Sequence, residues 1–179
     1  MKIVKNLTEF YHTLVNNEKL LRLLYYIPMD PSDDPLDPLK MDVSQLPEKD
    51  HILSKLIVIG DQTNDLAPET HCRICLYTGP RMPQKNYVKS QNQYMDNPYS
   101  STQHYIFDIY TPVSITPIDF RLDWLGEILN ELLFQESIEE FGDLRFHSGL
   151  PIPNVPQDFI GYRWIYSMSS GQLPTGYRL

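Results

Sequence analysis

Cysteines and long apolar runs are both scarce in this sequence. Its 179 residues include two cysteines, and no stretch approaches the roughly 20 apolar residues that a membrane span requires. Two cysteines cannot build a disulfide framework, and the N-terminal segment has no apolar signal region, so we expect free thiols in a reducing compartment. A chain of this size buries roughly 70% of its unfolded surface, which suffices for one core without metals or disulfides. We therefore expect a single domain over residues 1–179.

Positive charge is also in short supply. There are 15 lysines and arginines against 23 aspartates and glutamates, which gives a net charge of −8 and a pI near 5.0. Proteins that grip DNA displace its counterions with cationic side chains, so this composition argues against tight nucleic-acid binding. An acidic protein can still line a passage for DNA, because weak repulsion favours sliding over sticking.

The sequence contains no catalytic signature: no glycine-rich phosphate loop, G-x-S-x-G, H-E-x-x-H or paired carboxylates. Cys72 and Cys75 have the C-x-x-C spacing of redox and zinc sites. Positions i and i+3 of a strand face opposite sides, so we expect two separate, buried thiols. His71 and His104 could be neighbours across a hairpin, as at most a weak cluster. We expect no cofactor, metal or catalytic residue; a small redox enzyme or a ligand-binding domain is the alternative from another class.

Apolar periodicity predicts both helices and strands. Two amphipathic helical pieces are expected over residues 7–15 and 18–26, with Asn6 as the first N-cap. A longer helix should start at Thr116 as N-cap and end near Phe134. Strands are predicted over residues 53–59, 71–78, 103–110, 143–147 and 160–168. This order predicts an α+β fold: a small mixed, mainly antiparallel sheet flanked by helices.

Residues 28–47 form an acidic, proline-rich segment. Its members are Asp30, Pro31, Asp33, Asp34, Pro35, Asp37, Pro38 and Asp42. Proline removes backbone donors, so we expect an extended crossing of the surface, pinned by Leu36, Leu39 and Met41. Calcium is the sharper alternative, but the spacing lacks the central glycine and terminal glutamate of an EF-hand loop. A solvated acidic loop is the favoured interpretation. Residues 169–179 are expected to be an exposed tail.

The most informative feature is the long polar loop at residues 79–102, between two predicted strands. Most connections run about 4–6 residues, so a loop of this length is typically functional or disordered. Its tyrosines lie among Asn, Gln, Ser and Pro, a setting typical of interfaces. The candidate subunit or partner interface residues are Arg81, Lys85, Tyr87, Lys89, Tyr94 and Tyr99.

The same loop is locally basic on an acidic protein. This contrast favours head-to-tail contact between identical subunits, with the arm of one on the body of the next. As a two-stranded finger of about 12 residues per strand, it would reach roughly 40 Å. Disorder until docking is the alternative for this segment.

Four stretches together suggest a family. They are EKLLRLLYY at 18–26 running into DDPLDP at 33–38, CRICLYTG at 72–79, YIFDIY at 105–110 followed by RLDWL at 121–125, and FIGYRWIY at 159–166. Their layout resembles the tail terminator (neck, tail-completion) proteins of long-tailed bacteriophages. The chain is longer than is usual for that group, and the acidic segment and long loop account for the difference.

This resemblance implies a non-enzymatic virion protein with no catalytic residues to carry over. Such proteins form hexameric rings that cap the tail tube and join it to the head-completion complex around a DNA channel. The implied partners are further copies of the chain, the tail tube protein and a head-completion or stopper protein. DNA would pass without sequence-specific binding. The implied location is the virion neck, with the host cytoplasm during assembly. A head-closure or adaptor protein of the same connector is the nearest alternative.

Overall fold

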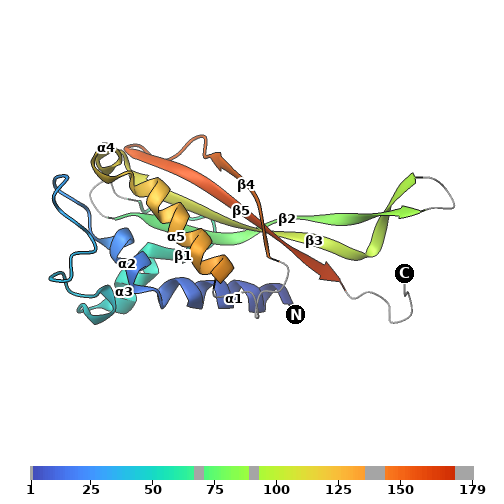
Figure 1. Ribbon diagram of the computed structural model, residues 1–179, viewed down its shortest axis with the longest axis horizontal. Helices are drawn as coiled ribbons and strands as arrows, with labels where there is room; N and C mark the ends of the chain where they lie inside the picture. The colour runs from blue at the N-terminus through green and yellow to red at the C-terminus, as the bar shows by residue number, and fades with distance from the viewer. Residues whose placement is uncertain (1, 67–70, 89–92, 136–143, 172–179) are drawn as a thin grey trace.

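A computed structural model describes the chain over residues 2–66, 71–88, 93–135 and 144–171 (Figure 1). The helices are α1 (Lys2–Val15), α2 (Glu18–Tyr25), α3 (Lys49–Leu56), α4 (Thr116–Asp119) and α5 (Arg121–Gln135), with 3-10 turns η1 (Val43–Gln45) and η2 (Val113–Ile115). The strands are β1 (Ile57–Ile59), β2 (Arg73–Val88), β3 (Gln93–Pro112), β4 (Arg145–Pro151) and β5 (Phe159–Gly171). None of the helices within these residues is long and apolar enough to span a bilayer.

The five strands form one sheet in the order β1-β2-β3-β5-β4. β1 runs parallel to β2, and the other neighbours are antiparallel. The predicted α+β class, with a mixed and mainly antiparallel sheet and a long hairpin arm, is therefore confirmed. Figure 1 shows β2 and β3 continuing past the body as this arm.

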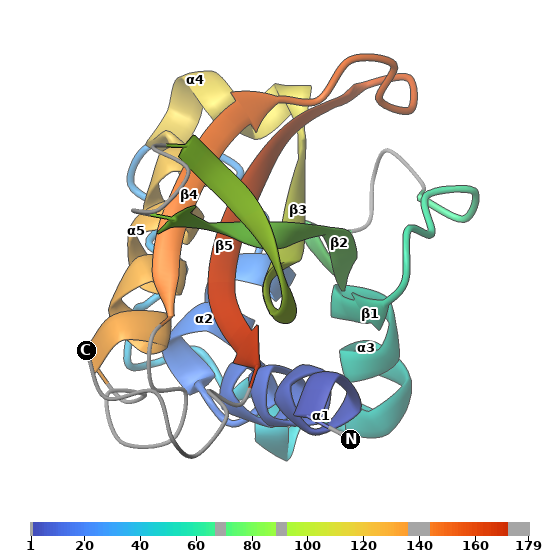
Figure 2. The ribbon, with the colours of Figure 1, turned by 90° about the vertical axis from the view of Figure 1, so that its right-hand side faces the viewer.

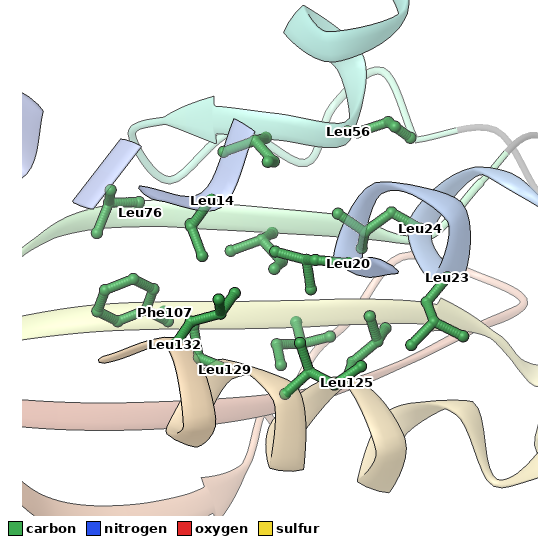
Figure 3. Packing of buried hydrophobic residues seen from close by; sticks show 14 of the residues in the cluster. Leu14, Leu20, Leu23, Leu24, Leu56, Leu76, Phe107, Leu125, Leu129 and Leu132 are labelled. Atoms are coloured by element: carbon green, nitrogen blue, oxygen red, sulfur yellow. The ribbon is translucent and has the colours of Figure 1, made fainter. Parts of the chain in front are cut away.

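The main core lies between one face of the sheet and helices α1, α2 and α5 (Figure 3). In α2, the side chain of Asn17 accepts a hydrogen bond from the backbone N–H of Leu20 at 2.9 Å and so caps the helix. Four leucines follow the cap within two turns and are all buried: Leu20, Leu21, Leu23 and Leu24. Each buried leucine contributes about 1.5–3 kcal/mol of hydrophobic stabilisation, so α2 is held mainly by packing.

One predicted helix start is wrong, and one predicted helix is divided in two. Asn6 lies inside α1, which already begins at Lys2, and its amide donates to the Tyr105 hydroxyl at 2.9 Å. Near Thr116 the predicted single helix is broken, because Phe120 has φ +52° and separates α4 from α5. The break places Arg121 against the C-terminal end of α2, where it bonds backbone carbonyls. Tertiary contacts thus override a continuous local pattern.

The strand boundaries also differ from the predicted ones. Most of the apolar run 53–59 belongs to α3, and only Ile57–Ile59 pairs as a strand, because a short apolar run does not distinguish the two states. β4 covers Arg145–Pro151 rather than 143–147, of which residue 143 lies outside the described residues. β5 runs to Gly171, which pairs with Ser100 of β3. Residues 169–171, predicted as the start of an exposed tail, therefore belong to the sheet. Residues 172–179 lie outside the described residues.

The acidic segment 28–47 is ordered by its own Asp-Pro-x triplets. In each triplet the aspartate Oδ1 accepts the N–H two residues on, from Asp30 to Ser32, Asp34 to Leu36 and Asp37 to Leu39, all at 2.8 Å. These are Asx turns, in which proline lacks a donor and presets the intervening φ. The carboxylates therefore serve the backbone, and the described residues contain no group of three metal-ligating side chains.

The expected pinning of this segment is partly wrong. Leu36 packs against the core, but Leu39 is 92% exposed and Met41 is also exposed. The anchors are instead polar and come from α2. Arg22 donates to the carbonyls of Asp37 and Lys40, and Glu18 accepts from the N–H of Val43 at 2.5 Å.

Gly126 of α5 faces the indole ring of Trp164 at very short range. A Cβ at this position would lie 2.1 Å from Cζ2 of Trp164. Trp164 has Phe146 and Tyr162 beside it, with ring centroids 5.7 and 5.6 Å away, so it has little room to move. A side chain at position 126 would therefore push on a packed aromatic group.

We predict that Gly126→Ala lowers the free energy of unfolding by about 1–2 kcal/mol. Alanine improves helix propensity by about 1 kcal/mol, but overpacking of about 1–3 kcal/mol and a contact far below van der Waals distance outweigh it. Urea unfolding measures the difference. Glu127→Ala, at an exposed position on the same helix, should stay within about 0.5 kcal/mol of wild type. A stabilised Gly126→Ala protein would contradict the packing.

Candidate interaction surface

The predicted loop 79–102 is built as a β-hairpin arm. β2 and β3 pair along it as far as Val88 and Gln93. β5 supports β3 up to Ser100, so beyond that point residues 84–88 and 93–97 form a two-stranded ribbon. At about 3.3 Å per residue, this ribbon projects roughly 15 Å beyond the three-stranded part. Figure 2 looks along the arm from its free end.

Two irregularities shape the arm. Between Thr78 and Arg81, β2 has one residue more than the facing part of β3. Opposite the step from Pro83 to Gln84, β3 has three additional residues, 98–100, without a partner in the register of β2. Such bulges bend a strand and increase its twist. Figure 1 shows β3 bending sharply near the outer part of the arm. The direction of the tip is thus set by the bulges.

The first bulge is fixed by close packing and hydrogen bonds. A Cβ on Gly79 would lie 2.8 Å from Cδ1 of Ile106 and 3.2 Å from Cβ of His104, so only glycine fits without a shift. The buried Gln103 amide donates to the carbonyls of Gly79 at 2.9 Å and His104 at 2.8 Å. The root of the arm is therefore a rigid joint.

A buried polar network sits at the same root, on the sheet face away from the main core. Asp108 is fully buried. Its carboxylate accepts hydrogen bonds from Nε and Nη2 of Arg163, at 2.7 Å each, and from the Tyr77 hydroxyl at 2.6 Å. Arg163 Nη2 also donates to the Tyr77 oxygen at 2.7 Å. These three residues cross-link β2, β3 and β5 beside the first bulge.

The electrostatics of the network favour one charge state. Its hydrogen bonds to Asp108 raise the pKa of Arg163 above its usual value. Burial, followed by the hydrogen bond to Asp108, raises the pKa of Tyr77. The arginine therefore stays charged and the phenol stays neutral near neutral pH, so these two groups form a fixed cross-link.

Five of the six predicted interface residues lie on the two strands of the arm. Arg81 is exposed on β2, and its Nε donates to the Ser101 hydroxyl at 2.7 Å. Lys85 is the Cα partner of Asp96, and Tyr87 is the partner of Tyr94. Tyr99 falls in the excess residues of β3. The side chains of Lys85, Tyr87, Tyr94 and Tyr99, and the whole of Lys89, lie outside the described part of the chain.

Sequence reasoning missed the residues that hold the arm, above all the Tyr77–Asp108–Arg163 network and Gln103. A signal was present, because Asp108 interrupts an otherwise apolar strand and Arg163 interrupts an aromatic one. Buried charges need partners, so each should have prompted a search for the other. Their pairing depends on the register of β3 with β5, which the sequence does not state.

The structure confirms the expectation for the cysteines. Cys72 packs in the main core, and Cys75 belongs to a smaller cluster with Tyr110 and Phe159 on the opposite face. Burial raises the pKa of Cys72 to about 12 and that of Cys75 to about 11. Neither thiol is a thiolate near neutral pH, and the two do not converge.

The suggested proximity of the two histidines is wrong. His71 stacks on Tyr25 with ring centroids 4.6 Å apart, whereas His104 lies against His147 at 4.4 Å. The hairpin register explains this, because Arg73 pairs with Tyr110, far along β3 from His104.

Fold and arm together define a small α+β protein that presents a rigidly rooted β-hairpin. The sequence model of the YomW family matches residues 17–168, and the chain belongs to that family. It is similar to the SPbeta prophage-derived uncharacterized protein YomW of Bacillus subtilis (strain 168), with 26% identity over 177 residues. The similarity covers 94% of this chain and 98% of that protein. This finding supports a phage origin, the coarser part of the resemblance, and does not bear on a tail-terminator role.

Proposed function

We propose that the chain is a structural, non-enzymatic protein of the phage neck. In this role it forms a ring that ends the tail tube and joins it to the head-completion complex around the DNA channel. The observation that carries the proposal is the arm: a two-stranded ribbon that projects from the body on a rigid root. An isolated hairpin of this kind is marginally stable in water, so a neighbouring surface is its natural support.

Two further observations support the proposal. The relative with near full-length similarity is prophage-derived. The fold is a mixed sheet with helices, which is the feature that separates a terminator from a head-closure protein built as a small β-barrel or helical bundle. The proposed partners are further copies of the chain, the tail tube protein and a head-completion or stopper protein. The proposed location is the virion neck, reached by assembly in the host cytoplasm.

Shortening the arm tests this function directly. Pro83 and Ser101 are Cα partners, so residues 84–100 can be replaced by Asn-Gly, the preferred two-residue hairpin turn. This variant keeps the first bulge, Gln103 and the Arg81–Ser101 bond. We expect it to fold with unchanged helix content, to remain at the mass of a single shortened chain, and to fail to dock on purified tail tubes.

The measurements are native mass and negative-stain microscopy of the protein, alone and mixed with tail tubes. Wild-type protein should give rings on tube ends, of six times the chain mass. A matched control is the double variant Ile59→Ser and Leu150→Ser, which removes two exposed apolar side chains from the sheet edges. It should assemble as wild type does. Normal assembly of the shortened variant would disprove an assembly role for the arm.

A further inference from the structure

The end of the molecule opposite the arm carries apolar side chains that the fold does not bury. Met29 is 90% exposed, Leu39 92%, Phe120 68% and Met41 54%. Figure 1 shows their segments, the 28–47 loop and the α4–α5 junction, at the end remote from the arm. We call these four residues the distal surface. Scattered exposed apolar residues are ordinary, but a gathering at one end typically marks an interaction site.

The carboxylate of Asp33 connects the segments that carry these exposed side chains. Asp33 accepts the N–H of Met29 at 3.1 Å and forms an ion pair with Lys40, the residue after Leu39. The hydrogen bonds from Lys40 and from the Met29 N–H hold the pKa of Asp33 below its usual value, and the charge of Arg121, directly after Phe120, makes a smaller contribution in the same direction. Asp33 therefore connects the backbone of Met29 with the neighbours of Leu39 and Phe120 in the chain.

The local backbone structure keeps these side chains exposed. The segment is ordered by Asx turns and by hydrogen bonds to Arg22 and Glu18, so its order does not depend on burying Leu39 or Met29. Phe120 stands in the left-handed region, at φ +52°, where glycine or asparagine would be less strained. A bulky aromatic residue held out in that conformation contributes little to the fold, which points to contact with another surface.

We propose that the distal surface receives the hairpin arm of a second copy of this chain. The inference rests on the proposed assembly role of the arm and specifies its receptor. Charge complementarity selects the occupant. The surface is flanked by ordered carboxylates, and Ser32 lowers the pKa of Asp30 by hydrogen bonding, so that carboxyl is ionised. In the arm, Arg81, Lys85 and Lys89 outnumber Asp96.

The placement of donor and receptor fixes the kind of assembly. Arm and distal surface lie at opposite ends of one chain (Figure 1), so a chain cannot satisfy its own surface. A head-to-tail contact between two copies leaves one free arm and one free surface, so it repeats and closes into a ring where the rotation between neighbours allows. The tyrosines in the arm sequence provide aromatic side chains that can pack against the exposed methionines and leucine of the distal surface.

Two complementary variants test the proposal. The surface variant combines Met29→Ser, Leu39→Ser and Phe120→Asn, and the arm variant has residues 84–100 replaced by Asn-Gly. Neither should self-assemble. Mixed in equal amounts, they should form a complex of two chains, because an intact arm meets an intact surface once. Its mass should stop at two chains, since the remaining arm and surface are both defective.

Each outcome has a defined meaning. If the surface variant forms rings as wild type does, or if the mixture stays at the mass of one chain, the receptor assignment is overturned. If the two-chain complex forms but wild-type protein ignores tail tubes, the contact stands and the proposed neck function fails. Binding of a different phage protein to the arm variant that is lost in the surface variant, with no complex between the two variants, would also overturn the proposal. Phe120→Asn alone should keep or raise the thermal midpoint, which separates lost assembly from lost folding.

The charge component has its own control. Lys85→Gln with Lys89→Gln should weaken self-association at least tenfold at 50 mM salt and less at 500 mM, because salt screens the attraction. The matched pair Lys49→Gln with Lys55→Gln removes the same charge from the exposed side of α3. Equal effects of the two pairs would overturn a specific role for arm charges in the docking.

Discussion

Replacing Arg163 by alanine is expected to lower the free energy of unfolding by about 3–5 kcal/mol, because it leaves the buried Asp108 carboxylate with only the Tyr77 hydroxyl. Asp108 has no solvent exposure that could compensate. Asp108→Ala should cost less, since Arg163 is 29% exposed and water can reach its charge. Urea unfolding of both variants measures the asymmetry.

The double replacement sharpens this prediction. Asp108→Leu with Arg163→Met removes the whole ion pair, and a buried pair exchanged for apolar groups is often close to neutral in stability. We therefore expect the double variant to be more stable than Arg163→Ala alone, which is the non-additivity of a coupled pair. A loss below about 1 kcal/mol in Arg163→Ala would show that the network does not hold the sheet.

Replacing Arg121 by methionine should also destabilise the protein by about 3–5 kcal/mol. This side chain is fully buried. Its guanidinium donates hydrogen bonds to the carbonyl oxygens of Leu23 and Tyr26, the latter at 2.8 Å. It also donates two hydrogen bonds to the carboxylate of Asp119, at 2.9 and 2.5 Å. It thereby caps the C-terminal end of α2 from another helix. Methionine fills the volume but leaves every acceptor unsatisfied.

Lysine at position 121 tests the geometry of that cap. A point charge cannot reproduce the planar fork of donors, so Arg121→Lys should recover only part of the loss. Arg145→Met, at an exposed position on β4, is the matched control and should change stability by at most about 0.5 kcal/mol. Equal stabilities for Arg121→Met and Arg145→Met would contradict the capping role.

Much of the fold was predictable from local pattern. The leucines at 20, 21, 23 and 24 marked α2, and the alternation along 103–110 and 160–168 marked the centres of β3 and β5. The positions of Cys72 and Cys75 on opposite faces followed from the two-residue period of a strand. These predictions succeeded because each depends on spacing within a few residues.

The failures share a different cause. Asn6 looks like a helix cap, yet α1 starts earlier at Lys2. A helix does begin at Thr116, but it is interrupted at Phe120, where Arg121 makes contacts with the distant end of α2. The apolar run at 53–59 has the pattern of a strand, although only its last three residues pair with β2. Leu39 and Met41 were expected to pin the acidic segment, whereas Arg22 and Glu18 hold it through the backbone.

For the candidate interface, the location was predictable from the sequence, but the residues that hold it were not. Its location in residues 79–102 came from length, tyrosines and charge, all of which can be read from the chain. Its rigid root could not be predicted, because Tyr77, Asp108 and Arg163 are separated by 31 and 55 residues and meet only across three strands. The receptor proposed at the distal surface depends in the same way on how two separate segments are brought to one end.

Local pattern was enough to predict the apolar faces of the main helices and strands, the two separate thiols, and one long polar segment apart from the core. Local spacing, charge and turn chemistry carry that information, because each acts over a few residues. Three features required the folded chain: the segment is a hairpin continuous with the sheet, an ion pair holds its root, and Phe120 and the acidic loop lie at the opposite end. Those features depend on strand register and helix packing, whose free energies arise between residues far apart in the chain.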